Sequence, residues 1–344
     1  MKSVIERVTN FANLYGAMQS CANGVRWKPS TIRFLQNGLE NVETLRQELL
    51  TGEYRMGKQI RFQIREPKVR EVTSLRFRDK VVQRSLIKNY LYHEITRHFI
   101  YDNVACQKGK GSKAAIKRLK VMMIKAYRLY ANEYYIHYFD IRHFFNSTPH
   151  TVAKKAIRKR VGDPWAVSLV DMLIDSYPGD KGIGLGSDVA QFTELSVLDG
   201  MDHYIKEKLH EKFYLRYMDD FIIISGSKAH LRKDCEAIRK ELGRRGLNLH
   251  ETKSRIVPVR RGIKWQGHLF RQTATGKIIM TVDKQKIYHE RRKLKRMVRL
   301  VKNGTIPKET ADSSLRSWTA HAKPGNNHKV IQKMHKYYES LWRN

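Results

Sequence analysis

The chain has 344 residues, of which 41% are hydrophobic, and it carries 67 Lys and Arg against 33 Asp and Glu. This apolar content excludes a disordered basic tail, and the length predicts a folded protein with more than one compact unit. The net charge of +34 at pH 7 extends along the whole chain, and nucleic acid is the polyanion that best neutralises it. A merely basic protein, or one held on anionic membranes, is the alternative.

The cysteines and the apolar runs indicate the cellular compartment of the protein. Cys21, Cys106 and Cys235 are widely spaced and form neither a CxxC pair nor a disulfide framework, which suits a reducing compartment. The N-terminus lacks an apolar signal core, and no uncharged apolar stretch is long enough to span a bilayer. We therefore predict a cytoplasmic protein that does not bind to membranes.

The first 98 residues are predicted to be largely helical. Apolar residues recur at intervals of three and four within residues 1–55, and the Thr-Gly pair at 51–52 is a helix stop. Residues 60–66 alternate apolar and polar side chains, which is typical of a strand. Another helix is predicted from about 78 to 98, with Asp79 as an acid near its N-terminal cap.

A basic, glycine-rich loop follows at residues 107–112 and opens a helix at Ser112. Its backbone N–H groups, together with Lys108 and Lys110, suit the phosphates of a nucleic acid backbone. The spacing of a Walker A motif is missing, and an ordinary helix start is the alternative. We expect this loop to contact phosphates.

Two apolar runs are predicted to form buried strands. Residues 134–141 are rich in aromatic and β-branched side chains, and residues 213–225 form two strand-like halves around a polar tip. This pattern predicts a hairpin with Asp219 and Asp220 at its turn. Helices are predicted between these strands, at 149–162, at 164–177 and, after a glycine-rich loop, up to 211. The pattern indicates an α+β fold in which helices back an antiparallel sheet.

The C-terminal part is basic and helical. Residues 283–302 contain nine Lys and Arg around an apolar seam. The seam consists of Ile287, Leu294 and Val301. Among the basic residues, Arg292 and Lys295 are expected to contact backbone phosphates. The last part of the chain is again predicted to be helical, with an interruption at 323–325.

Three aspartates are candidate metal ligands. Asp219 and Asp220 are adjacent on a tight turn, where like charges repel and burial raises the cost further. A divalent cation offsets that cost, because hard cations such as Mg²⁺ prefer carboxylate oxygens. Turns also favour Asp for local reasons, so the pair alone leaves that alternative open. Asp140 ends a buried aromatic strand, where an acid is costly without a metal or another partner.

These motifs, in this order, make the chain similar to the reverse transcriptase family. Tyr217-Met218-Asp219-Asp220 resembles the family's YxDD box, and Phe139-Asp140-Ile141 followed by Phe145 resembles its first catalytic motif. The resemblance covers nearly all of the chain beyond the N-terminal helices. The other stretches that carry it are 66–70 with 77–83 and 101–111 as fingers motifs, 262–268 as the primer grip, and 314–322 as a thumb helix.

The resemblance implies a right-hand polymerase of the α+β class, with fingers, a palm built on an antiparallel sheet, and a helical thumb. The expected parts are N-terminal helices at 1–55, fingers and palm at 56–274, and a basic thumb at 275–344. The implied activity is RNA-directed DNA polymerisation, with template RNA, dNTPs and the cDNA product as partners. Two Mg²⁺ ions, for which Mn²⁺ can substitute, are the implied cofactors.

The resemblance also implies roles for single residues. The metal ions would be held by Asp140, Asp219, Asp220 and the backbone carbonyl of Ile141. The incoming nucleotide would contact Lys68, Arg70, Phe145, Leu185, Gln191 and Lys253, with Phe145 excluding a 2′ hydroxyl. Nucleic acid would contact Lys108, Lys110, Trp265, Gly267, Arg292 and Lys295. The alternatives are plain: basic residues are often only solvated, and phenylalanines often belong to the core.

Within the family, residues 314–322 resemble the thumb of diversity-generating retroelement enzymes, which copy RNA with errors at adenines. Such an enzyme would have a small basic accessory protein oligomer as a further partner, and the aliphatic Leu185 predicts low fidelity. The loop departs from the usual GxPxGxxxSQ pattern, with Gly184 in place of proline and Ala190 in place of serine. An antiphage defence reverse transcriptase with a dedicated non-coding RNA is therefore an alternative. A catalytically inactive RNA-binding scaffold and an RNA-dependent RNA polymerase are the others.

Overall fold

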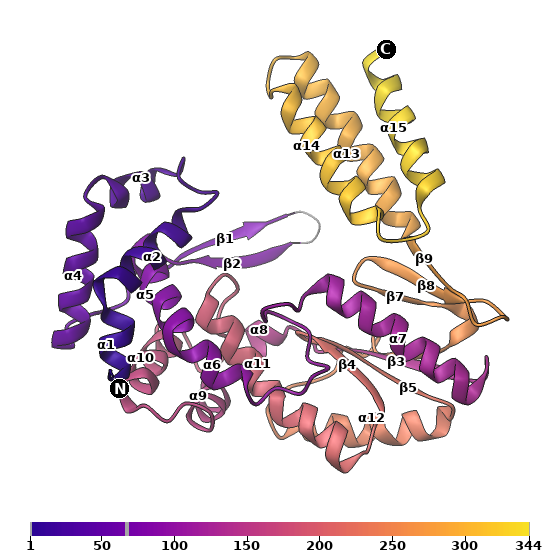
Figure 1. Cartoon of the computed structure of the whole chain (residues 1–344), viewed down its shortest axis with the longest axis horizontal. Helices are drawn as coiled ribbons and strands as arrows, with labels where there is room; N and C mark the ends of the chain where they lie inside the picture. The colour runs from indigo at the N-terminus through magenta and orange to yellow at the C-terminus, as the bar shows by residue number, and fades with distance from the viewer. Residues whose placement is uncertain (1, 66–68, 344) are drawn as a thin grey trace. The chain divides into compact units, whose positions relative to one another are not determined.

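The computed structural model describes residues 2–65 and 69–343, and the chain divides into two compact units. Unit 1 contains residues 1–111, 139–221 and 233–254. Unit 2 contains residues 112–138, 222–232 and 255–344. The N-terminal helices and all three candidate metal ligands therefore belong to unit 1, and the C-terminal helices belong to unit 2 (Figure 1).

Four helices open the chain, within the part that the sequence predicted to be helical. Their bounds are Val4–Thr9 for α1, Phe11–Ala22 for α2, Pro29–Gln36 for α3 and Gly38–Thr51 for α4. Ser3 and Glu6 form a capping box that satisfies the first N–H groups of α1. Gly52 follows α4 with a φ of 75°, a left-handed conformation that ends a helix, which confirms the predicted stop.

A two-stranded sheet and a helical segment follow in unit 1. The strands are β1 (Ile60–Ile64) and β2 (Arg70–Ser74), which pair antiparallel with Phe62 opposite Val72. The helical segment consists of α5 (Phe77–Leu86), a π-helical turn (Ile87–Leu91) and α6 (Tyr92–Thr96). The strand predicted at 60–66 and the helix predicted at 78–98 are thus confirmed for the residues described.

Asp79 has a different role from the predicted one. It lies in the first turn of α5, but its carboxylate is buried and accepts hydrogen bonds from the Tyr54 hydroxyl at 2.9 Å and the Gly57 N–H at 3.2 Å. Its side chain therefore links α5 to the segment that precedes β1. Burial raises the pKa of Asp79, and the two hydrogen bonds oppose that rise.

The central sheet has four strands in the order β4-β5-β3-β6. The bounds are Tyr135–Asp140 for β3, Phe213–Tyr217 for β4, Asp220–Ser225 for β5 and Arg255–Pro258 for β6. β3 pairs antiparallel with β6, with Tyr135 opposite Pro258. These strands confirm the strand predicted at 134–141 and the two strands predicted at 213–225, because both runs are dominated by aromatic and β-branched side chains that are buried in the sheet.

Helices separate these strands along the chain. They are α7 (Ser112–Tyr130), α8 (Phe144–Ser147), α9 (His150–Arg158), α10 (Pro164–Asp175), α11 (Asp188–His203) with a π-helical turn (Tyr204–Lys208), and α12 (Lys228–Gly243). Asp163 caps α10, which has Pro164 at its first position, and Ser187 caps α11. The predicted helix start at Ser112 and the α+β architecture are both confirmed.

The C-terminal part of unit 2 is a small sheet and three helices. The strands are β7 (Ile263–Trp265), β8 (His268–Gln272) and β9 (Ile278–Val282), preceded by a 3₁₀ turn (Val259–Arg261). The helices are α13 (Lys284–Lys302), α14 (Lys308–Ala322) and α15 (His328–Arg343). Leu294 of the predicted seam is fully buried among the three helices, and Ile287 and Val301 pack beside it. Within residues 2–65 and 69–343, no helix has the length and apolarity needed to cross a bilayer.

Candidate active site

The three candidate aspartates converge in unit 1. Asp140 is the last residue of β3, and Asp219 and Asp220 lie at the turn between β4 and β5. One carboxylate oxygen from each of the three lies within 4.8 Å of the other two. Asp140 is 8% exposed, whereas Asp219 and Asp220 are half-buried, because Asp219 lies in the hairpin turn and Asp220 is only the first residue of β5. The buried Asp-Asp pair expected from the sequence is therefore more exposed than predicted.

Stacked phenylalanines explain how these acids come to the same face. Phe139 and Phe221 are fully buried, and their rings stack with centroids 4.5 Å apart and planes at 10°. Each phenylalanine adjoins one of the aspartates, Asp140 in β3 and Asp220 in β5. Because successive side chains of a strand point to opposite faces, rings that meet on one face leave the two carboxylates on the other.

A buried arginine supports the hairpin turn. Arg216 is 0% exposed, and its Nη1 donates to the carbonyl oxygen of Met218 at 3.1 Å. Its Nε and Nη2 each donate to a carboxylate oxygen of Asp202, both at 2.6 Å, and Asp202 also accepts the Tyr214 hydroxyl at 2.6 Å. Burial alone would lower the pKa of Arg216, but the Asp202 carboxylate outweighs it and raises that pKa. This ion pair ties the residue before the two aspartates to α11.

Met218 itself adopts a left-handed backbone conformation, with a φ of 56°. Its sulfur lies 3.7 Å from the sulfur of Cys106, whose φ is 52°. The Cys106 thiol also lies 3.7 Å from Oε1 of Gln191, one of the residues predicted to contact the nucleotide. Burial raises the pKa of the Cys106 thiol, so this contact is made by a neutral, polarisable group. The structure thus brings Gln191 beside the turn that carries the aspartates.

A short segment after α12 runs along Asp140. The His250 N–H donates to the carbonyl oxygen of Asp140 at 2.7 Å, and Ile141 forms a β-bridge with Leu249. Lys253 Nζ donates to Asp140 Oδ1 at 2.7 Å. The lysine predicted to act on pyrophosphate therefore contacts one of the three aspartates directly. Ile141, the predicted carbonyl ligand, is buried next to Asp140.

A fourth carboxyl group lies close to this cluster. Glu194 of α11 is fully buried, and its Oε2 accepts the Thr148 hydroxyl at 2.8 Å. Among the described residues, its Oε1 has no hydrogen-bond partner. Burial raises the pKa of Glu194 well above its usual value, the Thr148 hydroxyl opposes the rise, and the negative charge of Asp219 adds to it. Glu194 therefore holds its proton to a higher pH than an exposed glutamate does.

The glycine-rich loop packs on β2. The Thr73 N–H donates to the carbonyl oxygen of Leu185 at 3.1 Å, and a Cβ added to Gly186 would lie 2.9 Å from the carbonyl oxygen of Thr73. Gly184 has a φ of 57°, which proline cannot adopt, so the departure from the family's loop pattern is part of the backbone conformation. The loop also reaches Phe145, whose carbonyl oxygen accepts the Ile183 N–H at 3.0 Å.

The other residues of unit 1 that are predicted to contact the nucleotide or nucleic acid lie in different environments. Lys68 lies outside the described residues, and the backbone of Arg70 begins β2. Lys108 is exposed, but Lys110 Nζ donates to the carbonyl oxygens of Tyr101 at 3.1 Å and Asn103 at 2.9 Å. Lys110 therefore stabilises its own loop, and burial lowers its pKa.

The residues of unit 2 that are predicted to contact nucleic acid differ in how exposed they are. Arg292 and Lys295 are exposed on α13, and Gly267 lies in the turn between β7 and β8 with a φ of 79°. Trp265 is only 3% exposed, so its indole packs inside the unit, and the direct nucleic acid contact expected from the sequence does not fit this burial. The alternation of β7 points this side chain inward while Lys264 points outward.

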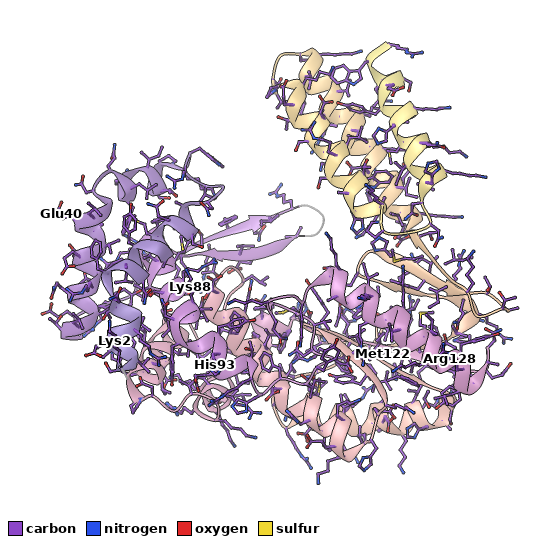
Figure 2. The ribbon with its side chains drawn as sticks, viewed as in Figure 1. Lys2, Glu40, Lys88, His93, Met122 and Arg128 are labelled. Atoms are coloured by element: carbon purple, nitrogen blue, oxygen red, sulfur yellow. The ribbon has the colours of Figure 1, made fainter. Side chains whose placement is uncertain are left out.

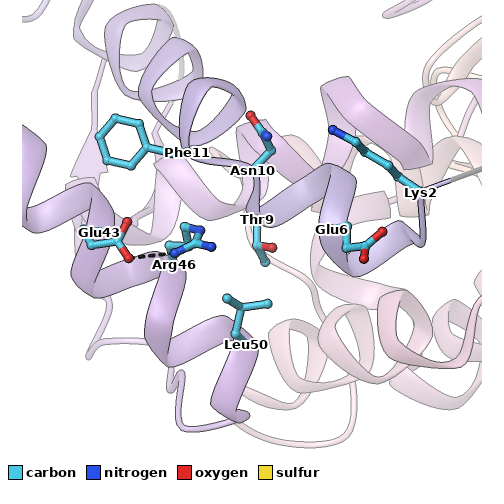
Figure 3. A pocket seen from close by; sticks show the side chains of 8 residues that line it. All are labelled: Lys2, Glu6, Thr9, Asn10, Phe11, Glu43, Arg46 and Leu50. Carbon is cyan, nitrogen blue, oxygen red and sulfur yellow. Dashed lines mark hydrogen bonds and ion pairs between the residues drawn. The ribbon is translucent and has the colours of Figure 1, made fainter.

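A pocket of about 490 Å³ lies between the N-terminal helices and is not part of the aspartate cluster (Figure 3). It is lined by residues in or next to α1, α2 and α4, among them Lys2, Glu6 and Leu50, and two further lining residues, Glu43 and Arg46, form an ion pair at 2.7 Å. Charged side chains project from the elements of both units, as the labelled Lys88 and Arg128 illustrate (Figure 2).

Four residues around the aspartates were not predicted from the sequence, namely Arg216, Asp202, Glu194 and Thr148. One signal was present: Arg216 is a charged residue inside an apolar strand, which is costly unless a buried partner exists. No comparable signal identifies Glu194, because its neighbours become known only once α11 is packed.

The comparisons with known proteins found a family model that matches the chain and solved structures that are similar to it. The model of the family described as "Reverse transcriptase (RNA-dependent DNA polymerase)" matches residues 64–270, which is more than half of the chain. Among solved structures, the chain is similar to apo telomerase from Candida tropicalis, with a TM-score of 0.49 and 12% sequence identity. The similarity covers 65% of this chain and 48% of the telomerase chain, so this chain spans about half of that length. No curated protein matches the chain.

Proposed function

The chain belongs to the reverse transcriptase family, and we propose from this premise that it is an RNA-directed DNA polymerase that copies a structured template RNA into cDNA. Its helices and antiparallel sheets are those of the right-hand polymerase fold. The observation that carries the proposal is the convergence of Asp140, Asp219 and Asp220, with one oxygen from each within 4.8 Å of the others. These acids come from two separate strands that the fold brings together.

The donor set fits two divalent metal ions. Three carboxylates at close range repel one another unless cations offset their charge, and hard oxygen ligands suit Mg²⁺, for which Mn²⁺ can substitute. Asp140 already contacts a cation, the ammonium of Lys253. We assign the metal ions to the three aspartates and the backbone carbonyl of Ile141. When bound, such ions polarise the triphosphate and favour the deprotonated 3′ hydroxyl of the primer.

The proposed reaction is a nucleotidyl transfer. The primer 3′ oxygen forms a bond to the α-phosphorus of the dNTP, the bond from that phosphorus to the bridging oxygen breaks, and pyrophosphate leaves. We propose that Lys253, through its Nζ, donates a proton to the pyrophosphate. Phe145 would lie beneath the deoxyribose, where its ring leaves no space for a 2′ hydroxyl, so that the product is DNA and not RNA.

Other residues would bind the substrates. We assign Lys68 and Arg70 to the triphosphate, where negative charge develops during transfer. Leu185 would contact the nucleotide from the glycine-rich loop, whose packing on β2 supports this placement, and Gln191 would do so from the first turn of α11. The nucleic acid backbone would contact exposed basic residues and one turn. These are Lys108, Arg292, Lys295 and the turn at Gly267, with Lys110 stabilising the loop that presents Lys108.

The large positive charge supports RNA as the partner. A net charge of +34 favours a polyanion bound with steep salt dependence, because binding releases condensed counterions. We assign fingers and palm to residues 56–274 and the basic thumb to residues 275–344, with helices at 1–55 before them. A cytoplasmic location suits the three free thiols.

Two biological roles fit this activity. We propose error-prone copying in a retroelement, assisted by a small basic accessory protein oligomer, because the aliphatic Leu185 cannot form a hydrogen bond with its side chain. The departures at Gly184 and Ala190 favour the second role, an antiphage defence enzyme with a dedicated non-coding RNA. An inactive RNA-binding scaffold is the alternative of another class, and the complete set of aspartates argues against it.

Primer extension tests the proposal. The purified chain, given a DNA primer on an RNA template, dNTPs and Mg²⁺, is expected to extend the primer, and removal of the metal by a chelator is expected to stop extension. Ribonucleotides should be rejected. Tight RNA binding without extension under either metal would support the scaffold and contradict the polymerase.

A further inference from the structure

The loop between α2 and α3 exposes an indole ring beside two cations. Trp27 is 73% exposed, although tryptophan is usually among the more buried residues. Arg26 and Lys28 flank it and are also exposed, and Lys28 Nζ lies 5.6 Å from the centroid of the Trp27 ring. The sequence contains no Asp or Glu between Glu6 and Glu40. The exposed aromatic surface thus lies in a stretch of sequence that carries basic residues and no acidic one.

The loop holds this ring in a defined position. Trp27 Nε1 donates to the carbonyl oxygen of Gly24 at 3.3 Å, and the Lys28 N–H donates to the carbonyl oxygen of Val25 at 3.0 Å. Pro29 then begins α3, which fixes the following backbone. An aromatic side chain that is already ordered loses little conformational entropy when it binds a ligand. The exposed indole is therefore suited to binding.

α5 packs beside α3, the helix that follows the loop, and brings another lysine near Lys28. α3 packs on α5 through Phe34 and Phe77, whose ring centroids are 5.2 Å apart. Lys80 of α5 lies near Lys28: burial lowers the pKa of Lys80, and the charge of Lys28 lowers it further. The Trp27 loop thus belongs to unit 1, which also contains the three aspartates, and it adjoins α5 in that unit.

We propose that Trp27, with Arg26 and Lys28, binds a single-stranded segment of RNA outside the active site, with an unpaired base stacked on the indole. Flat aromatic rings beside cations bind single strands in this way, because every base has a face for stacking and every linkage has a phosphate. Bases in a duplex are already stacked and offer no such face. The proposal rests on the proposed function, since the single strand is assigned as unpaired template RNA, which an RNA-directed polymerase must hold ahead of copying.

Binding of short oligonucleotides to the full chain tests this site. The probes are a fluorescent single-stranded RNA of about 15 nucleotides, the matching RNA duplex, and a DNA strand of the same sequence. Trp27→Ala is expected to weaken binding of the single-stranded RNA about tenfold and to leave duplex binding unchanged. Trp27→Phe, which retains a ring, should keep most of the affinity. Leu39→Ala removes another exposed apolar side chain (62% exposed) from the same unit and is the matched control.

Tryptophan fluorescence gives a second, site-specific reading. RNA should quench part of the emission of the wild-type chain, and this part should be missing in Trp27→Phe. Unchanged RNA affinity in Trp27→Ala would overturn the proposal and leave the indole to a protein contact, and a loss confined to the DNA strand would overturn the assignment to RNA. Extension of a short, fully paired primer–template is expected to continue in Trp27→Ala. A chain without polymerase activity that still binds RNA through Trp27 would contradict the proposed function alone.

Discussion

Lys253 Nζ donates to Asp140 Oδ1 at 2.7 Å, so that an ammonium group contacts one of the three clustered aspartates. The positive charge offsets part of the repulsion among the carboxylates. A metal ion and the Lys253 ammonium group would therefore compete for the carboxylate of Asp140. We therefore expect Lys253 to compete with the metal in the free enzyme, in addition to the proposed donation of a proton during the reaction.

Replacing Lys253 separates these two roles. Lys253→Met is expected to bind Mg²⁺ several-fold more tightly, because Asp140 loses its competing cation, and to turn over about 10²-fold or more slowly, because the proton donor is gone. Both quantities come from Mg²⁺ titrations of primer extension. Lys253→Arg retains the cation and should keep the wild-type Mg²⁺ dependence. Weaker Mg²⁺ binding in Lys253→Met would contradict the competition.

Asp219→Asn removes one negative charge from the cluster with little change in shape. We expect polymerisation to fall by several powers of ten, since metal-borne charge stabilisation supplies much of the catalysis. RNA binding should persist, because it depends on basic residues elsewhere. Single-turnover extension and filter binding measure the two effects, and full activity in this variant would show that Asp219 is not a ligand.

The Arg216–Asp202 pair should dominate the stability of the hairpin. Arg216→Met leaves the Asp202 carboxylate buried without its partner, which costs about 3–5 kcal/mol of the free energy of unfolding. The double variant Arg216→Met with Asp202→Leu should recover much of that loss, because no unpaired charge remains. Urea denaturation of both variants measures this. Similar losses in the single and double variants would mean that the carboxylate is not the source of the cost.

Glu194 should make stability depend on pH. Its pKa is raised well above the ordinary value of 4.5 in the folded chain, so its contribution is fully present below 4.5 and is lost as pH rises through the folded pKa. Over that window the loss is about 1.4 kcal/mol per pH unit for one proton. Glu194→Gln keeps an acceptor for Thr148 and cannot ionise, so its free energy of unfolding should fall less steeply.

Denaturation curves at several pH values, recorded in a chelator, test this prediction for Glu194. The chelator matters because a cation at Asp219 would remove the charge that helps to raise the pKa. The difference between wild type and Glu194→Gln should grow from about pH 5 upward. Parallel curves would show that Glu194 titrates normally.

Leu185 is predicted to lower the fidelity of copying. An aliphatic side chain cannot donate or accept a hydrogen bond near the incoming nucleotide, and one such bond is worth about 0.5–1.5 kcal/mol, enough for a several-fold change in discrimination. Leu185→Gln is therefore expected to lower the error rate several-fold, mainly at template adenines. Sequencing cDNA from a defined template compares the two enzymes. Equally low error rates in both would favour the defence role.

Much of this protein could be predicted from its sequence, because local patterns determine local structure. The aromatic run that became β3, the apolar halves around Asp219 and Asp220, and the basic helix with its seam at Leu294 all follow from periodicity within a few residues. The three aspartates were identified for the same reason, since an acid beside a buried run is locally anomalous.

The tertiary structure decided what depends on residues far apart in the chain. The contact of Lys253 with Asp140, the raised pKa of the buried Glu194 near Asp219 and the burial of Trp265 are properties of packing, and no window of sequence contains both partners. Trp27 shows the converse: its type alone predicts a buried residue, and only the fold leaves it exposed. Burial and charge pairing are set by which elements meet, and that is a property of the whole chain.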